Sequence, residues 1–275
     1  MAHVISIPVG TRLVGTVGSL PALIGIGVAY FVGAKVAFLI GTASDKIFAP
    51  FWPPNIILFC ALVFTPPARW WLTIAAVFPA HAIAELSVGM RTEPLLIAFA
   101  TNCLVAVLNA ISVRWLLGGA PWFGTVNKAV AYIVATASIN PAITAFGGAF
   151  VPILSGGHWG DYWLCWSAWF LGNALAALTL GPIFLTWTNT GWPDLVRTTR
   201  LRRGLEAALL AVALAVVCLA SLKLDVSMSG GPFVSIILCL PLPIILWASL
   251  RFGEKGASAG ILVLTVVSRA MPEFG

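Results

Sequence analysis

Long apolar stretches alternate with short connections rich in polar residues, glycine and proline along almost the whole chain. A helix needs about 20 mostly apolar residues to cross the hydrocarbon core of a bilayer. Two of the stretches, residues 51–65 and 256–271, are short enough to be tilted, re-entrant or only partly inserted. We therefore expect an all-α, polytopic transmembrane helix bundle of about eight to ten helices. The apolar stretches are 20–41, 51–65, 70–89, 94–117, 128–153, 162–188, 204–222, 233–250 and 256–271.

The composition excludes most other classes of protein. Hydrophobic residues make up 60% of the 275 residues and charged residues 9%, against about 45–50% and about 25% in soluble proteins. The five cysteines lie singly in apolar stretches, without the spacing of a metal or redox motif. No nucleophile elbow, phosphate-binding loop or metalloprotease motif is present. The sequence therefore indicates no catalytic residues, no metal ligands and no particular cofactor.

The distribution of basic residues predicts the orientation. Cytoplasmic loops of membrane proteins are enriched in Lys and Arg. With the N-terminus in the cytoplasm, ten basic residues fall on the cytoplasmic side and four on the other, and residues 197–203 form the densest cluster. We expect a cytoplasmic segment over 1–19 and a transmembrane domain over 20–275. The basic residues lie at segment ends and form no patch for nucleic acid. The ten are Arg12, Arg69, Arg114, Lys128, Arg197, Arg200, Arg202, Arg203, Arg251 and Lys255.

His81 and Glu85 are the most unusual pair within the apolar stretches. They lie four residues apart, so they share one face of a helix. Ionisable residues inside a membrane are costly and often functional, and a carboxylate can accept a hydrogen bond from an imidazole at this spacing. The pair is either a sensor of protons or of a ligand, or a mutually satisfied packing pair.

Amide side chains form further polar faces. Asn102 and Asn109 lie seven residues apart on the fourth segment, Asn140 lies on the fifth and Asn173 on the sixth. Such residues commonly hold helices together through hydrogen bonds. The alternative is a shared polar pocket. Because a short connection joins the third and fourth segments, we expect the face of His81 and Glu85 to meet that of Asn102 and Asn109.

Tryptophan and proline mark two other places. Trp52, Pro53, Pro54 and Asn55 open the second segment, where the prolines indicate a helix start or a local break. Asn55 is a candidate partner for backbone groups left free there. The tryptophans at 159, 163, 166 and 169 are typical of an aromatic belt at the membrane surface, although such rings can also line a ligand site.

Several of these stretches, in this order, resemble the first family of MASE-type membrane-associated sensor domains. They are Phe51-Trp52-Pro53-Pro54-Asn55, Arg69-Trp70-Trp71, Asn102 before Arg114, Trp166 to Asn173 before Gly181-Pro182, Arg251-Phe252-Gly253 and Pro272-Glu273-Phe274. The resemblance covers most of residues 20–275. It implies a bacterial inner-membrane module that precedes a histidine kinase, diguanylate cyclase or phosphodiesterase domain. It supplies no agreed ligand-binding residues.

Three functions therefore remain open. The first is a sensory input domain that binds a small ligand or senses a membrane state and transmits it to a cytoplasmic output domain, in cis or in trans. Output domains of the family usually work as dimers, which makes a homodimer possible. The second is a small-molecule transporter, and the third is a non-catalytic subunit of a larger membrane complex. The candidate sensing residues are Trp52, Asn55, His81, Glu85, Asn102, Asn109, Asn140 and Asn173.

Overall fold

A computed structural model describes five stretches of the chain, and every regular element in them is helical. The expected cytoplasmic segment lies outside the described residues except for Ser19, as do Arg197 to Arg200 and residues 233–240. The described residues fall into two compact units, divided between Gly181 and Pro182. Each unit is treated by itself below. The described stretches are residues 19–42, 51–119, 122–187, 201–227 and 241–270.

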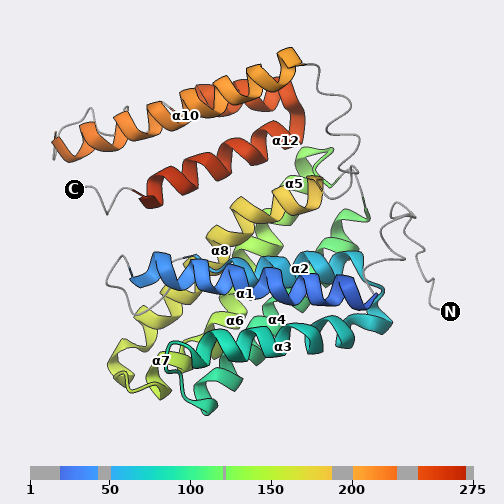
Figure 1. Cartoon of the computed structure of the whole chain (residues 1–275), viewed down its shortest axis with the longest axis vertical. Coiled ribbons are helices and arrows are strands. Elements are labelled where there is room, and N and C mark those ends of the chain that lie inside the picture. Colours follow the sequence, from blue (N-terminus) through green and yellow to red (C-terminus); the bar gives the residue numbers. More distant parts are fainter. Residues whose placement is uncertain (1–18, 43–50, 120–121, 188–200, 228–240, 271–275) are drawn as a thin grey trace. The chain divides into compact units, whose positions relative to one another are not determined.

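The first unit contains, in chain order, the first five predicted segments and the sixth as far as Gly181, where the helix of the sixth segment continues past the division (Figure 1). Four of its helical stretches are long and apolar enough to cross a membrane: Leu20–Leu39, Thr92–Leu117, Val126–Leu154 and Trp159–Thr186. This confirms an all-α membrane bundle. The elements are α1 (Leu20–Thr42), α2 (Pro53–Phe64), the turn η1 (Pro67–Arg69), α3 (Trp70–Leu86), α4 (Thr92–Leu117), α5 (Val126–Tyr132), the π-helix η2 (Ile133–Ile139), α6 (Asn140–Gly148), α7 (Phe150–Leu154), the turn η3 (Trp159–Asp161) and α8 (Tyr162–Trp187).

Helices α1 and α3 run parallel, side by side (Figure 1). Tyr30 contacts His81, and Lys35 contacts Ser87 farther along both chains. Residue numbers therefore rise together in the two helices, and the chain must reverse twice between them. Helix α2 makes the return between α1 and α3.

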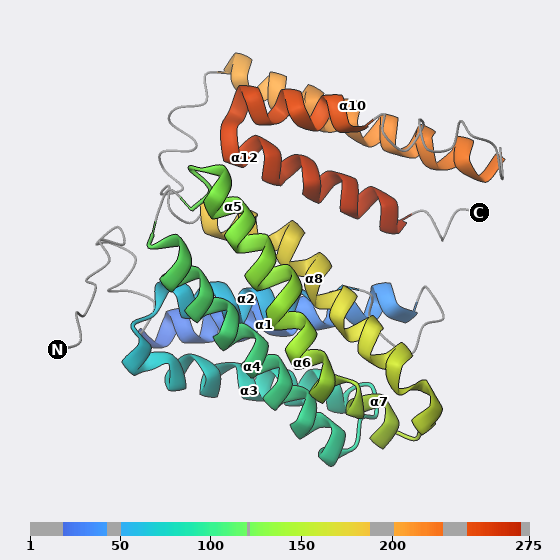
Figure 2. The same cartoon turned by 180° about the vertical axis from the view of Figure 1, so that it is seen from behind.

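The same reasoning places the later helices. Asn55 contacts Asn102, and Val63 contacts Arg114, so α2 and α4 are also parallel. In contrast, Asn140 contacts Asn109, whereas an added Cβ on Gly147, farther along the chain, would meet the side chain of Thr101, which precedes Asn109. The stretch α5–η2–α6 is therefore antiparallel to α4, and Figure 2 shows it lying alongside that helix.

The fifth segment is not the uniform α-helix that we expected over 128–153. It passes from α5 into the π-helix η2, then into α6, and is broken again at Ala149 before α7. Pro141 supplies a physical reason for the first change. It has no backbone N–H, and its ring crowds the carbonyl four residues earlier, so the turn before it widens. Asn140 lies directly after this π-helix.

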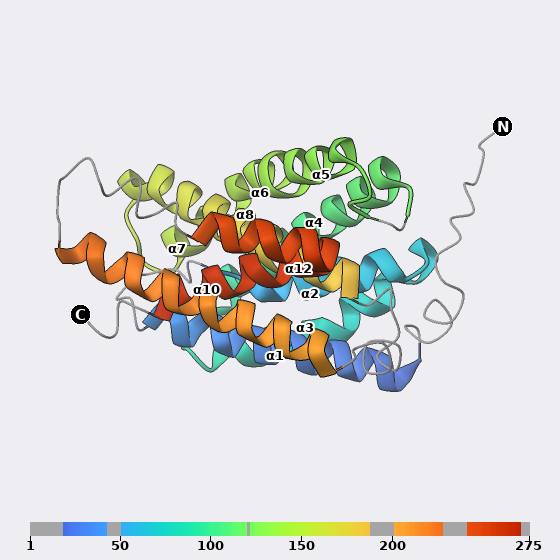
Figure 3. The same ribbon diagram turned by 90° about the horizontal axis from the view of Figure 1, so that it is seen from above.

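The second unit holds α10 (Leu201–Ser227) and α12 (Pro241–Ala270), which pack side by side (Figure 3). Gly253 has φ 63° and ψ −146°, so α12 consists of two helical pieces that meet at this glycine. The two pieces fit the separate eighth and ninth segments predicted from sequence. Pro241 and Pro243 lie in the first turn of α12, where proline is tolerated, and the residues of the eighth segment before them lie outside the described part of the chain.

Candidate functional site

Helix α2 begins inside the first unit. It has only 12 residues, and its first turn, including Pro53, Pro54 and Asn55, is buried. The two proline rings lie against Gly33, near the middle of α1, at 3.5 and 3.6 Å from the position of an added Cβ. Because proline has no N–H, two of the donors that a helix start normally leaves unpaired are absent here. The Trp-Pro-Pro-Asn sequence thus permits a helix to start in an apolar core.

The other end of α2 is held by two long side chains. The Arg114 guanidinium donates to the carbonyl oxygens of Val63 and Thr65, at 2.9 and 3.2 Å. The Trp70 indole N–H donates to Leu62 and Thr65 carbonyls, both at 2.9 Å. These contacts satisfy the carbonyls at the end of α2, of which that of Leu62 also accepts from the backbone N–H of Thr65.

Asn55 joins three helices through one amide group. Its Nδ2 donates to the Oδ1 of Asn102 on α4 at 2.9 Å and to the Oδ1 of Asn173 on α8 at 2.7 Å. The three side chains are 1%, 1% and 5% exposed. The Oδ1 of Asn55 and the Nδ2 of Asn102 form no hydrogen bond of good geometry in the described part of the chain. The cluster therefore keeps one acceptor and one donor group available in the core.

Asn109 and Asn140 form a second amide cluster. The Asn140 Nδ2 donates to the Asn109 Oδ1 at 2.9 Å and to the Ser112 hydroxyl oxygen at 3.0 Å. The backbone carbonyl of Asn140 accepts from the Thr144 hydroxyl at 2.9 Å. The residue that follows the π-helix is thus bonded directly to α4. We expected Asn109 to lie against His81 and Glu85. Its hydrogen-bond partner is instead Asn140.

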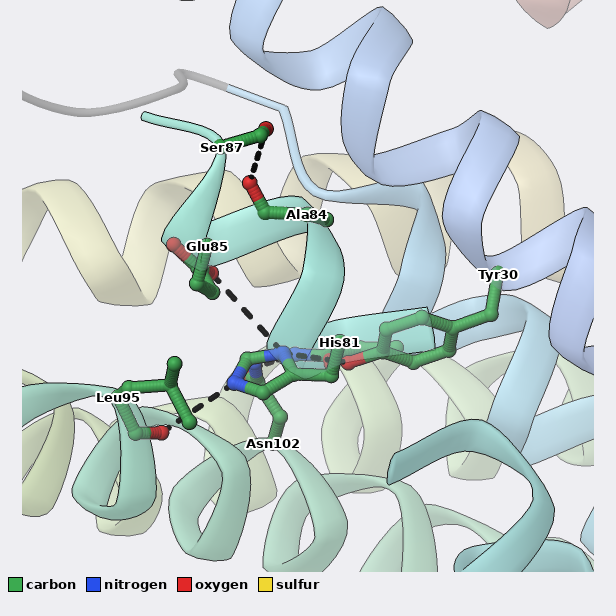
Figure 4. Close-up of polar contacts among 8 residues, drawn as sticks. Tyr30, His81, Ala84, Glu85, Ser87, Leu95 and Asn102 are labelled. Atoms are coloured by element: carbon green, nitrogen blue, oxygen red, sulfur yellow. Dashed lines mark hydrogen bonds and ion pairs between the residues drawn. The ribbon is translucent and has the colours of Figure 1, made fainter. Parts of the chain in front are cut away.

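His81 and Glu85 face the interior of the unit, at 0% and 3% exposure, as expected (Figure 4). The His81 Nε2 lies 3.2 Å from the carbonyl oxygen of Leu95 on α4. Its Nδ1 lies 3.4 Å from the Tyr30 hydroxyl on α1 and 3.9 Å from Glu85 Oε1. The Phe99 ring covers the imidazole at a centroid distance of 5.2 Å. The imidazole therefore has polar neighbours on three helices.

Asn102 connects the histidine cluster to the amide cluster. Figure 4 shows its side chain beside Tyr30 and His81, and it interacts with the Tyr30 hydroxyl. Leu95, Asn102 and Asn109 follow one another at seven-residue intervals on α4. At these three levels α4 is hydrogen-bonded to α3, to α2 and to α6. Helix α4 is thus the element that the buried polar contacts share.

Two other sequence predictions concern the ends of the helices. Trp159 and Trp163 are 67% and 66% exposed, which suits an interfacial belt. Trp52 packs on Phe38 of α1, with a ring-centroid distance of 5.4 Å, and takes no part in the amide cluster. Lys35, the basic residue inside the first apolar stretch, donates to the Ser87 hydroxyl at 2.9 Å.

Sequence reasoning missed Tyr30 and Arg114 as members of these contacts. Tyr30 is the one tyrosine of the first apolar stretch, and a buried tyrosine hydroxyl usually has a hydrogen-bond partner, which was the available signal. Within the described residues there is no group of three or more His, Cys, Asp or Glu side chains that could hold a metal ion. The clusters are built from amide, hydroxyl, imidazole and carboxyl groups, which can donate and accept hydrogen bonds.

Comparison with known proteins agrees with this architecture. The family model MASE1 matches residues 22–271. No curated protein and no solved structure matches the chain. The match covers both units and includes every residue of the buried polar clusters.

Proposed function

The chain belongs to the MASE1 family of membrane sensory domains, and we propose that it is the input module of a signalling protein. A stimulus acts at the buried polar clusters and changes how the helices of the first unit pack. A cytoplasmic output domain, in cis or in trans, responds to that change in packing. The protein acts as a homodimer. The module itself performs no catalysis.

One observation carries this proposal: α4 is tied to three other helices by buried polar groups at seven-residue intervals. A signal needs two arrangements that differ in their affinity for the stimulus. Hydrogen bonds between helices can change from one partner to another, whereas purely apolar packing offers no second, distinct arrangement of partners. Any change of partner at Leu95, Asn102 or Asn109 also alters the contacts of the same rigid helix with its neighbours.

The orientation we propose places the N-terminus in the cytoplasm of a bacterium, with the domain in the inner membrane. Because the six segments of the first unit alternate in direction, Arg69, Arg114 and Lys128 share one end of the bundle. Glu85, Glu93 and Asp161 share the opposite end. Basic residues favour the cytoplasmic side, so the acidic end faces outward.

Fusion of a reporter histidine kinase after residue 275 tests the sensory function. Autophosphorylation would be measured in membranes while pH, osmolarity and a panel of small metabolites are varied. We expect at least one condition to change kinase output, and Asn102→Leu to remove that response. The control is the same kinase anchored by an unrelated membrane helix. An inserted, folded fusion that ignores every condition contradicts the proposal.

A second candidate function, transport of a small molecule, is favoured by a separate observation. Helix α2 begins near the level of the middle of α1, and the π-helix η2 interrupts the fifth segment. Transporters place broken helices at their binding sites near mid-membrane. Saturable uptake of amino acids or sugars into sealed proteoliposomes would support this function, and the sensory proposal predicts none.

A further inference from the structure

We propose that the Nδ1 atom of His81 is a proton-binding site, and that proton binding moves its hydrogen bond from Tyr30 on α1 to Glu85 on α3. The inference deepens the sensory function proposed above by naming the stimulus as protons. It starts from the positions of the two ring nitrogens. The Nε2 lies beside a backbone carbonyl oxygen, which can only accept a hydrogen bond. Nε2 therefore carries a hydrogen in both states.

In the neutral imidazole, Nδ1 is then an acceptor. The only O–H within hydrogen-bond distance of it in the described residues is the Tyr30 hydroxyl, at 3.4 Å. This bond joins α1 to α3. The carboxylate of Glu85, 3.9 Å from the same nitrogen, cannot donate while it is ionised, and its Oε2 has no hydrogen-bond partner in the described residues. The neutral ring thus leaves the Oε2 of a buried carboxylate without a donor.

When a proton from water binds Nδ1, the ring becomes an imidazolium and Nδ1 becomes a donor. The Tyr30 hydroxyl can no longer donate to it, and Glu85 Oε1 becomes the favoured acceptor. An imidazolium and a carboxylate attract strongly where water is excluded, and the pair has no net charge. The proton is the only atom gained, and no covalent bond to carbon changes. The result is loss of a contact between α1 and α3.

Loss of its hydrogen bond to His81 leaves the Tyr30 hydroxyl able to form other contacts. Tyr30 lies beside Asn102, which accepts a hydrogen bond from Asn55. When the hydroxyl turns away from His81, its oxygen can accept a hydrogen bond from Asn102 Nδ2, which has no partner of good geometry in the described residues. A proton at His81 is therefore connected to the contact between α2 and α4.

The other ionisable groups around the pair are few. From α1, Tyr30 and Lys35 face this region, and Lys35 is bonded to Ser87, two residues after Glu85. From α4, the Cys103 thiol lies close enough to Tyr30 to interact with it electrostatically. At the start of α4, the exposed Arg91 and Glu93 pair with each other at 3.4 Å.

The position of Glu85 indicates the side of the membrane from which protons reach the site. It lies in the last turn of α3, and the residues from Leu86 to Gly89 are exposed. With a cytoplasmic N-terminus, this end of α3 faces outward. The site then binds protons from the outer side of the membrane.

The test is nitrogen NMR of the full chain labelled with 15N-histidine, in lipid nanodiscs, over about pH 5 to 8. His81→Gln assigns the His81 signals. We expect His81 to change from an Nε2–H neutral ring to an imidazolium within this window. Glu85→Gln should abolish the change, whereas Glu93→Gln, which alters an exposed carboxylate at the same end, should leave it intact. Tyr30→Phe, a second variant in case Glu85→Gln does not fold, should move the midpoint toward alkaline pH by removing the competing donor.

Two results overturn the proton site: a His81 ring that stays in one form across the window, or the same transition in wild type and Glu85→Gln. The reporter fusion keeps this outcome separate from the sensory function. If the ring titrates and kinase output does not follow pH, the proton site stands and proton sensing fails. If output responds to another stimulus while the ring is unchanged, the sensory function stands alone.

Discussion

The side-chain amide of Asn55, near the start of α2, donates to the side-chain oxygen of Asn102 at the middle of α4, with an N···O distance of 2.9 Å. The same Asn55 nitrogen also donates to Asn173 on α8 at 2.7 Å. One residue thus uses both of its amide hydrogens to hold two different helices. Because the short helix α2 begins at this point, its position in the bundle depends on that residue.

We predict that Asn55→Ala lowers the stability of the protein by about 1–3 kcal/mol, since two buried carbonyl oxygens lose their donor. The free energy of unfolding would be measured by titration with a denaturing detergent in mixed micelles. Asn127→Ala, an exposed asparagine at the start of α5, is the matched control and should be neutral within about 0.5 kcal/mol. Equal stability of wild type and Asn55→Ala would show that the three-helix contact is not formed.

The contact between Asn109 and Asn140 can be measured by a double-mutant cycle with Asn109→Ala and Asn140→Ala. Hydrogen bonds between transmembrane helices contribute on average about 0.6 and at most about 1.7 kcal/mol. We expect a coupling energy in this range, because the Nδ2 to Oδ1 distance is 2.9 Å. A cycle between Asn109 and Asn55, which form no direct contact in the structure, should give less. Additive effects of Asn109→Ala and Asn140→Ala would argue against the hydrogen bond.

The sequence predicts which faces of the helices are polar but not which faces meet. Asn102 and Asn109 share a face of α4 because they are seven residues apart, and this spacing is visible in the sequence. Their partners, Asn55 and Asn140, lie 47 and 31 residues away. Many helix arrangements satisfy the same spacing, and the packing of α2 and α6 selects among them. For that reason Asn109 was expected beside His81 and lies instead beside Asn140.

Tyr30 and the π-helix show a different limit. Tyr30 lies in an apolar stretch where an aromatic ring is normally a packing residue, and only the fold brings its hydroxyl within 3.4 Å of His81. Pro141 signals a disturbance of the fifth segment, but a kink, a break and a wider turn all relieve the same steric clash. The neighbouring helices determine which of these forms.

The orientation is tested by labelling single cysteines in whole cells after the five native cysteines have been replaced. A cysteine in place of Arg200 should react with a membrane-impermeant maleimide only after the cells are opened. A cysteine in place of Val88, which is 50% exposed after the end of α3, should react in intact cells because it lies at the end of the bundle opposite Arg69 and Arg114. The reverse pattern would show that the N-terminus lies outside and that protons would reach His81 from the cytoplasm.

The close contact between Tyr132 and Gly181 gives a prediction with an internal rescue. The Tyr132 hydroxyl donates to the Ala177 carbonyl at 2.7 Å and fills the space in which a side chain at position 181 would begin. Gly181→Ala should therefore destabilise the protein by about 1–3 kcal/mol through overpacking. Tyr132→Phe removes the hydroxyl oxygen and costs about 1 kcal/mol for the lost hydrogen bond, but Gly181→Ala should cost less in that background.

Gly25→Ala is the control, since nothing lies within 4 Å of an added Cβ there, and better helix propensity should make it neutral or stabilising by up to about 1 kcal/mol. Equal costs of Gly181→Ala with and without the Tyr132 hydroxyl would show that the two helices do not approach each other at this point.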